Sequence, residues 1–227
     1  MTDSGGQDVI GIVGGTGALG RGLARRFAAA GVSVIIGSRD AARAAASAGE
    51  LNALLPEARV RGLGNLDAAR EAGLVVLTVP FGHQRATLEE IAPALDGKVL
   101  VDTTVPLVPP KVARVQLPPA GSAAVIAQQL LGESVTVVGA FHNVAADALD
   151  SDEPLDCDVL VAGDDPAARQ RVVELARRAG LRAWHAGALV NSAAAEALTS
   201  VLIFMNKRYG GVHTGLRITG LDDAGGE

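Results

Sequence analysis

The chain has 227 residues, of which 48% are hydrophobic and 3% aromatic, and its formal net charge is −5. The apolar share suffices for the core of one sizeable domain, whereas the acidic balance argues against nucleic acid or an anionic membrane as a partner. The single cysteine, Cys157, excludes an internal disulfide and a cysteine metal cluster. The N-terminus is short and polar, and no unbroken apolar run reaches about 18 residues. These features predict a soluble cytoplasmic protein without a membrane span.

Short β-branched runs alternate along the chain with Ala-, Leu- and Arg-rich segments of helical period. Strands are expected at 9–13, 33–39, 74–80, 98–104, 135–141, 157–163 and 181–187, with a weaker pattern at 59–63. Helices are expected at 19–31, 41–54, 83–95, 122–132, 166–180 and 191–210. Continuous apolar strands separated by helices indicate an α/β fold, namely a Rossmann-type, doubly wound and mostly parallel sheet. We expect a dinucleotide-binding domain over 1–149 and a small C-terminal α/β extension over 150–227.

Two segments depart from this alternation. Residues 105–122 contain five prolines and little periodicity, which indicates an ordered loop of the kind that often serves a function. The long apolar helix expected at 191–210 could pack in the core or form a subunit interface. We favour the interface, and therefore a homodimer.

A glycine-rich stretch, VGGTGALGRGLA, lies between the first expected strand and the first expected helix. It carries the pattern G-x-G-x-x-G as Gly15-Thr16-Gly17-Ala18-Leu19-Gly20. In such a loop the first glycine permits a tight turn, the second lets the backbone approach a pyrophosphate, and the third allows close packing of helix on strand. The free N–H groups and positive dipole end of the following helix also favour phosphate. The stretch therefore predicts a dinucleotide site.

The end of the second strand indicates which dinucleotide is bound. An NAD site needs an acidic residue there to accept a hydrogen bond from the ribose 2′-hydroxyl. This chain has Ser38 and Arg39 instead, with Arg43 one helical turn later. A hydroxyl and two guanidinium groups can hold a 2′-phosphate. Asp40 is the nearest acid, and we expect it to cap the next helix. The sequence thus favours NADP(H).

Two common reductase chemistries lack their residues in this chain. The single tyrosine, Tyr209, is followed four positions later by His213, so the Tyr/Lys pair of short-chain dehydrogenases is missing. Lys207 and Asn206 lie too near the C-terminus to serve as in hydroxyacid dehydrogenases of the 6-phosphogluconate type. Clustered carboxylates that would indicate a metal site are also missing. An acceptor that takes hydride on a ring carbon, such as a flavin-like ring, needs neither a catalytic acid or base nor a metal.

Several longer motifs carry a resemblance to a known family. They are GGTGALGRGLA, the GSR after the second strand, LTVPFGH (77–83), VDTTVPLVP (101–109), AFHNVAADAL (140–149) and GALVNSAAAEALTSVLIFMNKRYG (187–210). In this order they resemble the F420-dependent NADP reductases, which pass a hydride between NADPH and the 5-deazaflavin coenzyme F420. The resemblance runs from residue 8 to about residue 221 of the printed sequence. The first two motifs are common among NADP proteins, and the later ones are far more specific.

The resemblance implies a role for individual residues. The pyrophosphate would be bound by Thr16, Gly17, Ala18 and Leu19. The 2′-phosphate would be bound by Ser38, Arg39 and Arg43. Thr78, Val79, Pro80 and Phe81 would line the nicotinamide side, with Ala146 closing over it and His83 a candidate contact to the nicotinamide ribose. Val105 and Pro106, His142 and Leu216 would lie along the deazaflavin, so the C-terminal extension would complete that site. Family members often carry Trp at the position of Phe81 and Pro at that of Ala145, and these departures bear on the second substrate.

The acidic tail of coenzyme F420 would need local positive charge. The candidates are Lys111 and Arg114 in the proline-rich loop and Arg208 and Arg217 near the C-terminus. Two other readings stay open at this stage. One is an NADPH-dependent flavin or ferric reductase of the same fold, and the other is a non-catalytic NADP(H)-sensing module.

Overall fold

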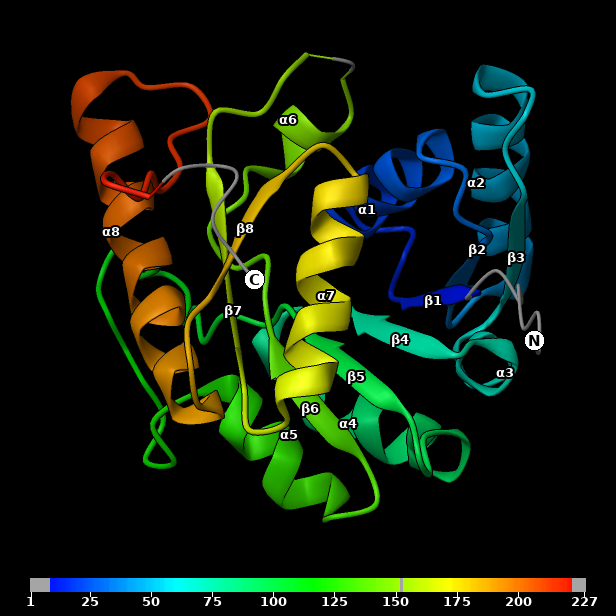
Figure 1. Cartoon of the computed structure of the whole chain (residues 1–227), viewed down its shortest axis with the longest axis horizontal. Helices are drawn as coiled ribbons and strands as arrows, with labels where there is room; N and C mark the ends of the chain where they lie inside the picture. The colour runs from blue at the N-terminus through cyan, green and yellow to red at the C-terminus, as the bar shows by residue number, and fades with distance from the viewer. Residues whose placement is uncertain (1–8, 152, 222–227) are drawn as a thin grey trace.

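A computed structural model describes residues 9–151 and 153–221 of the chain. In this part of the chain, eight strands form one central sheet in the order β3-β2-β1-β4-β5-β6-β7-β8 (Figure 1). The strands are β1 (Ile10–Val13), β2 (Val34–Ser38), β3 (Val60–Gly64), β4 (Leu74–Leu77), β5 (Val99–Asp102), β6 (Thr136–Gly139), β7 (Asp158–Gly163) and β8 (Arg182–His185). The α-helices are α1 (Ala18–Ala29), α2 (Ala41–Leu54), α3 (Asn65–Glu71), α4 (Phe81–Ile91), α5 (Ala123–Leu131), α6 (Ala146–Leu149), α7 (Pro166–Arg178) and α8 (Ser192–Tyr209). Two short 3-10 helices, Ala92–Ala94 and Leu189–Asn191, extend α4 and precede α8.

The sheet is parallel except at one place. Neighbouring strands from β3 to β6 run parallel, whereas β7 pairs antiparallel with β6 through Val138 and Gly163. β8 then runs parallel to β7. The strand order reverses between β1 and β4, which is the switch point where open α/β sheets bind ligands. The predicted Rossmann-type α/β class with a mostly parallel sheet is confirmed.

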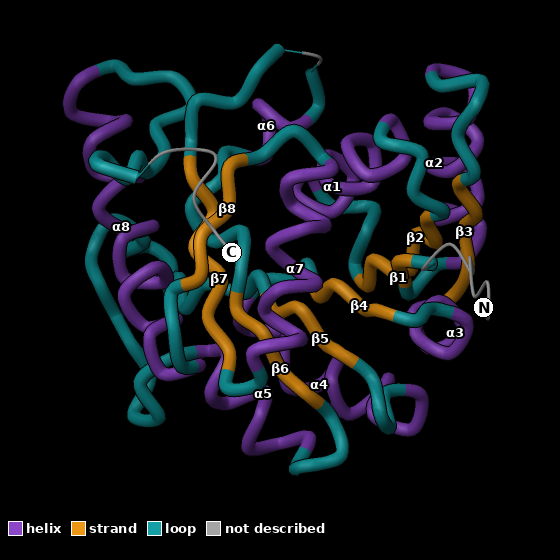
Figure 2. Tube along the Cα trace, viewed as in Figure 1, coloured by secondary structure: helices purple, strands orange, loops and turns teal. Residues whose placement is uncertain are grey.

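Helices cover both faces of the sheet, as Figure 2 shows by colour. On one face α1, α2 and α7 bury side chains such as Phe27, Leu51 and Val172 against the strands. On the other face α4 and α5 bury Leu88 and Ala127. Because side chains of a strand point alternately to opposite faces, strands covered on both sides become continuous apolar runs. This is why the strand pattern was readable in the sequence.

Close approach of helices to the sheet depends on small residues. A Cβ placed on Gly11 of β1 would lie 2.8 Å from the Ala68 carbonyl oxygen and 2.8 Å from the Ala72 Cβ. A Cβ on Gly62 of β3 would lie 2.2 Å from the Ala44 carbonyl carbon of α2. At these positions only glycine lets the helix backbone come so near the strand. The chain therefore builds its core with few aromatic side chains.

The element boundaries differ from the expected ones in ways that matter for the site. β4 ends at Leu77 and β6 at Gly139, two or three residues earlier than predicted, because Pro80 lacks a backbone donor and Phe141 adopts a left-handed φ of 64°. His142 therefore lies in a turn after β6, not at the end of the strand. Two short helices, α3 and α6, were not predicted.

The helix α8 packs on α5 and β7 along one side and leaves the other side exposed (Figure 1). The stretch Leu189–Tyr209 is 21 residues long, and its most apolar window of 18 residues has a mean hydropathy of 1.3 and is 33% buried. By length and composition this stretch could cross a membrane, although helices packed on soluble proteins meet the same criterion. The sequence criterion of an unbroken apolar run did not register it, because Ser192 and Glu196 interrupt the run.

Candidate functional site

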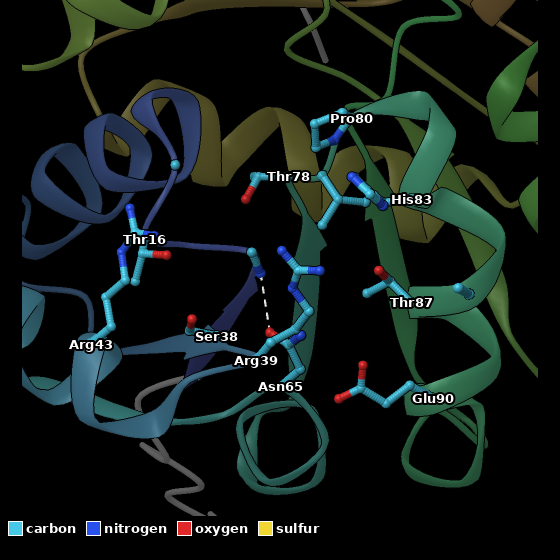
Figure 3. A pocket seen from close by; sticks show the side chains of 14 residues that line it. Thr16, Ser38, Arg39, Arg43, Asn65, Thr78, Pro80, His83, Thr87 and Glu90 are labelled. Atoms are coloured by element: carbon cyan, nitrogen blue, oxygen red, sulfur yellow. Dashed lines mark hydrogen bonds between the residues drawn. The ribbon is translucent and has the colours of Figure 1, made fainter.

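A pocket of about 240 Å³ lies at the carboxyl ends of β1, β2 and β4, where the strand order reverses (Figure 3). It is lined by Gly14, Thr16, Gly17, Ser38, Arg39, Arg43, Asn65, Thr78, Val79, Pro80, His83, Ala86, Thr87 and Glu90. The structure thus brings the glycine loop, the end of β2 and the start of α4 together in one cavity. Eight of these residues were predicted from the sequence: Thr16, Gly17, Ser38, Arg39, Arg43, Thr78, Val79 and Pro80, with His83 as a further candidate.

The glycine loop has the geometry that phosphate binding requires. Gly17 caps α1 with extended backbone angles, and no acidic residue lies in the first turn of that helix. The N–H groups of this turn therefore have neither helix partners nor a competing carboxylate. A Cβ on Gly20 would lie 2.6 Å from both the Gly15 Cα and the Thr78 Oγ1. The third glycine of the pattern therefore packs helix α1 against the strands, as predicted.

The end of β2 offers three donors for an anion. Ser38 is the last residue of β2, and its hydroxyl accepts the Asp40 N–H at 3.2 Å. The Asp40 carboxylate accepts the N–H groups of Ala42 and Arg43 at 3.0 and 3.2 Å, so it caps α2 as predicted. Within residues 9–151 and 153–221 no hydrogen bond or ion pair engages the guanidinium of Arg39 or of Arg43. Both cations are therefore available to a ligand in the pocket.

Several lining residues were missed by sequence reasoning. Asn65 begins α3, and its side-chain oxygen accepts the Gly14 N–H at 3.3 Å, which ties the glycine loop to the end of β3 (Figure 3). Asparagine directly after a strand was the available signal, but no helix was predicted there. Ala86, Thr87 and Glu90 lie on α4 and face the pocket because they follow His83 at helical spacing.

The nicotinamide-side segment connects β4 to α4. The Thr78 hydroxyl donates to the Val13 carbonyl at 2.9 Å, which fixes the segment to β1. Pro80 is the N-cap of α4, and Phe81 is the first helical residue. Phe81 does not line the pocket, whereas Val79 and Pro80 do.

The remaining predicted residues lie outside this pocket. Gly15 is buried, and Ala18 and Leu19 open helix α1, where Leu19 packs on the core. Ala146 opens α6, which lies against α1: a Cβ on Gly22 would be 3.1 Å from the Ala146 carbonyl oxygen. Val105 and Pro106 follow β5, and Pro106 is buried.

A second, smaller pocket of about 180 Å³ lies between the turn after β6 and helix α8. It is lined by His142, Asn143, Val144, Ala145, Thr199, Leu202, Ile203, Asn206 and Thr214. The Asn143 amide donates to the Ala195 carbonyl at 2.8 Å and to the Thr199 hydroxyl at 3.0 Å. These bonds hold the turn on α8.

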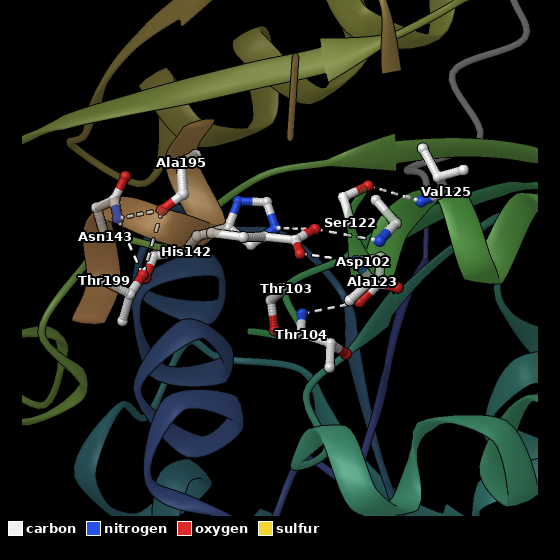
Figure 4. A network of polar contacts seen from close by, with 12 residues as sticks. Asp102, Thr103, Thr104, Ser122, Ala123, Val125, His142, Asn143, Ala195 and Thr199 are labelled. Carbon is white, nitrogen blue, oxygen red and sulfur yellow. Dashed lines mark hydrogen bonds and ion pairs between the residues drawn. The ribbon is translucent and has the colours of Figure 1, made fainter. Parts of the chain in front are cut away.

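The His142 imidazole does not reach open solvent in this structure. Its side chain is 1% exposed, and its Nε2 lies 4.0 Å from a carboxylate oxygen of Glu196 (Figure 4). Burial lowers the pKa of His142 to about 4. At neutral pH the ring is therefore uncharged, and it lies against Glu196.

Two buried carboxyl groups accompany His142, and neither was singled out from the sequence. Asp102 ends β5 and accepts hydrogen bonds from the Thr104 N–H at 2.8 Å and from the Gln84 amide at 2.5 Å. Burial raises the pKa of Asp102 to about 6. Glu196 of α8 accepts the N–H groups of Ala123 and Ala124, and burial raises its pKa to about 8. A lone glutamate in an apolar helix is the signal that could have identified Glu196.

The chain after α8 returns toward the turn at His142. The Leu216 carbonyl accepts the Asp158 N–H at 2.7 Å, and a Cβ on Gly215 would lie 3.7 Å from the Asn143 carbonyl oxygen. Leu216 therefore lies near the second pocket, although it does not line it. Among the cations suggested for an acidic tail, Arg217 is paired with Asp156, and Arg208 lies over the Tyr209 ring.

Groups that other reductases use are not assembled here. Tyr209 is 75% exposed at the end of α8, so it is not a buried proton donor. Within residues 9–151 and 153–221, no three His, Cys, Asp or Glu side chains are grouped to hold a metal ion.

A family model and three curated relatives of about 40% identity name the same family. Residues 9–106 match the family model described as NADP oxidoreductase, coenzyme F420-dependent. The chain is 41% identical over 222 residues to the F420-dependent NADP reductase of Methanocaldococcus jannaschii, covering 94% of this chain and 99% of that one. It is 42% identical over 222 residues to the protein of the same name from Methanothermobacter thermautotrophicus, covering 94% and 96%. A crystal structure from Arthrobacter sp. FB24, described as an F420-dependent NADP reductase, aligns with a TM-score of 0.79 at 27% identity, covering 94% and 100%.

Proposed function

The chain belongs to the family of F420-dependent NADP reductases, and we propose that the switch-point pocket and the region beside it hold the two reactants of this family's reaction. It is an oxidoreductase that transfers a hydride between NADP(H) and coenzyme F420. In the proposed arrangement, the pocket at the β1–β4 switch point binds NADP(H). The deazaflavin lies beside it, toward the turn after β6 and helix α8.

One observation carries the NADP(H) half of the proposal. The N-terminus of α1, the Ser38 hydroxyl and the guanidiniums of Arg39 and Arg43, which no described residue pairs, line one cavity. The helix N-terminus and residues Thr16 to Leu19 receive the pyrophosphate. Ser38, Arg39 and Arg43 receive the 2′-phosphate, because charge-assisted hydrogen bonds favour a phosphate over a hydroxyl.

The segment after β4 orients the nicotinamide. Thr78 is fixed to Val13, so Val79 and Pro80 present a defined wall to the ring. His83 lines the same end of the pocket and contacts the nicotinamide ribose. Phe81 supports this wall from the first turn of α4, and Ala146 closes the site from the side of α6.

The deazaflavin is held by segments from both parts of the chain. Its surroundings are formed by Val105 and Pro106, by the backbone of the turn at His142, and by Leu216. Residues 150–227 act as the extension that completes this site, with Lys111 and Arg114 as the cations still available for the acidic tail. The bound cofactors supply the redox chemistry, and hydride passes directly between their rings. The chain's part is to orient the rings and exclude water, without a protein acid or base.

We also propose that the protein is a cytoplasmic homodimer. The exposed side of α8 carries Val201, Phe204, Met205 and Tyr209, with exposed fractions from 40% to 75%. A second copy would cover these apolar side chains, which a monomer leaves in water. The same covering accounts for the apolar character of α8 without a membrane.

The decisive test follows each chromophore separately. Purified protein is mixed with NADPH and oxidised F420, FMN or FAD, and the absorbance of each acceptor is recorded. We expect F420 to bleach at saturating NADPH, with little change in the two flavins. Turnover of FMN alone would instead support a flavin reductase. Binding of NADPH without turnover of any acceptor would support a sensing module.

A further inference from the structure

We propose that Glu90 makes the cofactor pocket selective for an adenine base by accepting a hydrogen bond from its exocyclic amine. This inference rests on the proposed binding of NADP(H) in the switch-point pocket. It assigns a role to the wall formed by helix α4, which the phosphate-binding and nicotinamide-binding residues leave unexplained.

The wall is one stripe of α4. His83, Thr87 and Glu90 follow one another at spacings of four and three residues, so they lie on one side of the helix. All three line the pocket, and Figure 3 shows their side chains facing the Arg39 guanidinium across it. The cavity between Arg39 and this stripe is therefore a slot with a flat cation on one side and a helix on the other.

The position along the helix identifies the part of the cofactor that enters the slot. His83 belongs to the nicotinamide end, next to Thr78 and Pro80 (Figure 3). Glu90 is seven residues further along α4, which corresponds to roughly 10 Å at the helical rise per residue. In Figure 3, Ser38 and Arg39, the proposed 2′-phosphate ligands, lie away from Pro80 and toward the end of the pocket that holds Glu90. The base attached to that phosphorylated ribose therefore lies nearest to Glu90.

The charge of Glu90 needs a partner of a particular kind. The pocket receives a polyanion, so a carboxylate on its wall opposes binding unless it accepts a hydrogen bond from the ligand. Neighbouring Glu89 lies 3.5 Å from Arg85, an i,i+4 pair on the helix surface. For Glu90, by contrast, the described residues supply neither an ion pair nor a hydrogen bond.

An adenine base supplies the missing donor. Its exocyclic amine donates to a carboxylate, while its flat ring can stack on the planar guanidinium of Arg39. A hypoxanthine base has a carbonyl oxygen at the same position and therefore places an acceptor against an acceptor. Binding sites that hydrogen-bond a donor discriminate against analogues that lack it, because the bound analogue covers the acceptor without pairing it.

The test compares NADPH with reduced nicotinamide hypoxanthine dinucleotide phosphate. Wild type should use NADPH with a kcat/KM about tenfold higher, since Glu90 is exposed in the free protein and solvent weakens its charged hydrogen bond. Glu90→Gln should reduce this preference to about twofold, because the amide can donate to the hypoxanthine carbonyl. Glu89→Gln, on the same helix but outside the pocket, is the matched control and should keep the wild-type preference.

Two results would overturn the proposal. Equal kcat/KM for the two dinucleotides in wild type would show that the pocket does not recognise the exocyclic group of the base. An equal loss for both dinucleotides in Glu90→Gln would show that Glu90 affects binding of the whole cofactor and does not distinguish the base. Calorimetric binding of the two dinucleotides is measured alongside turnover. If wild type binds them with the expected preference but reduces no F420, the function fails and this inference stands.

Discussion

Glu196 and Ala123 are 73 positions apart in the sequence, yet the Glu196 carboxylate accepts the Ala123 N–H at 2.7 Å. Its second oxygen accepts the Ala124 N–H at 3.1 Å. These are the first two residues of α5, directly after the proline-rich loop. A carboxyl group of α8 thus completes the N-terminus of α5, and it joins the C-terminal extension to the segment that leads into the second-substrate site.

Removing this carboxyl group should destabilise the fold. Glu196→Ala leaves two buried N–H groups without acceptors, which costs about 2–4 kcal/mol of unfolding free energy when summed over both groups. Urea unfolding monitored by circular dichroism measures the loss. Glu133→Ala removes an exposed carboxylate and should change the stability by less than about 0.5 kcal/mol. Equal stability of the two variants would contradict the assigned role of Glu196.

The same group predicts the direction of a pH effect. Burial is the largest influence on Glu196 and raises its pKa from 4.5 to about 8. The hydrogen bonds from the Ala123 and Ala124 N–H groups act in the opposite direction. The folded chain therefore binds a proton between these values that the unfolded chain releases, so stability falls as pH rises from about 4.5 to about 8. In thermal melts across this window, Glu196→Gln should show a flatter decline than wild type. A parallel decline would mean that Glu196 is ionised in the folded chain at neutral pH.

His142 predicts the opposite slope on the acid side. Burial lowers the pKa of His142 from its usual 6.5 to about 4, so the unfolded chain binds the proton more readily. Its contribution to stability is complete above pH 6.5 and is lost as the pH falls toward 4. His142→Gln should therefore lose less stability between pH 6.5 and 4.5 than wild type does, as measured by urea midpoints. Asp102, whose pKa is raised, acts in the opposite sense and serves as the internal comparison.

The cofactor half of the site could be predicted from the sequence because its signals are local. A glycine loop between strand and helix, and Ser38 with Arg39 at a strand end, each lie within a few residues of one another. Their backbone geometry follows from secondary structure alone. The topology then brought them together in one pocket, as Figure 3 shows.

The residues that were missed act across long sequence separations. Asn65 supports Gly14 from 51 positions away, and Glu196 reaches α5 from 73. No local pattern encodes such a contact, because it exists only once the sheet has formed. The predicted strands were also too long at their carboxyl ends. Apolar composition continues past Leu77 and Gly139, but Pro80 and the left-handed backbone of Phe141 end the pairing between strands. His142 therefore lies in the turn that follows β6, where its ring packs against Glu196.

The cofactor preference depends on the free guanidinium of Arg39. Arg39→Ala should lower kcat/KM for NADPH by about 10- to 100-fold, the range of one charged hydrogen bond. The value for NADH should change by less than about threefold, because NADH lacks the 2′-phosphate. Steady-state F420 reduction with both dinucleotides measures the ratio. A loss of the same size for NADH would show that Arg39 supports the fold or the base slot alone.

Gly20 tests the packing role of the third glycine. A Cβ there would lie 2.6 Å from the Gly15 Cα, which is backbone and cannot move aside. Gly20→Ala should therefore displace α1 from the sheet, destabilise the chain by about 2–4 kcal/mol and abolish tight NADPH binding. Gly49→Ala is the matched control: Gly49 lies inside α2 with nothing within 4 Å of the added Cβ. That variant should gain about 0.5–1 kcal/mol, since alanine is the better helix former. Both are measured by thermal melts and NADPH titration.

The exposed side of α8 leads to a prediction about assembly. Phe204 is 52% exposed and Met205 40%, in a helix whose opposite side is fixed to α5 by Glu196. If a second copy covers this side, a charge at Phe204 would be desolvated in the interface, and Phe204→Glu should shift the protein from dimer to monomer. Light scattering coupled to size exclusion measures the mass. Arg85→Glu, on the exposed surface of α4, controls for added negative charge and should leave the dimer intact. A monomeric wild type at micromolar concentration would contradict the proposed interface, and the apolar side of α8 would then require a different partner.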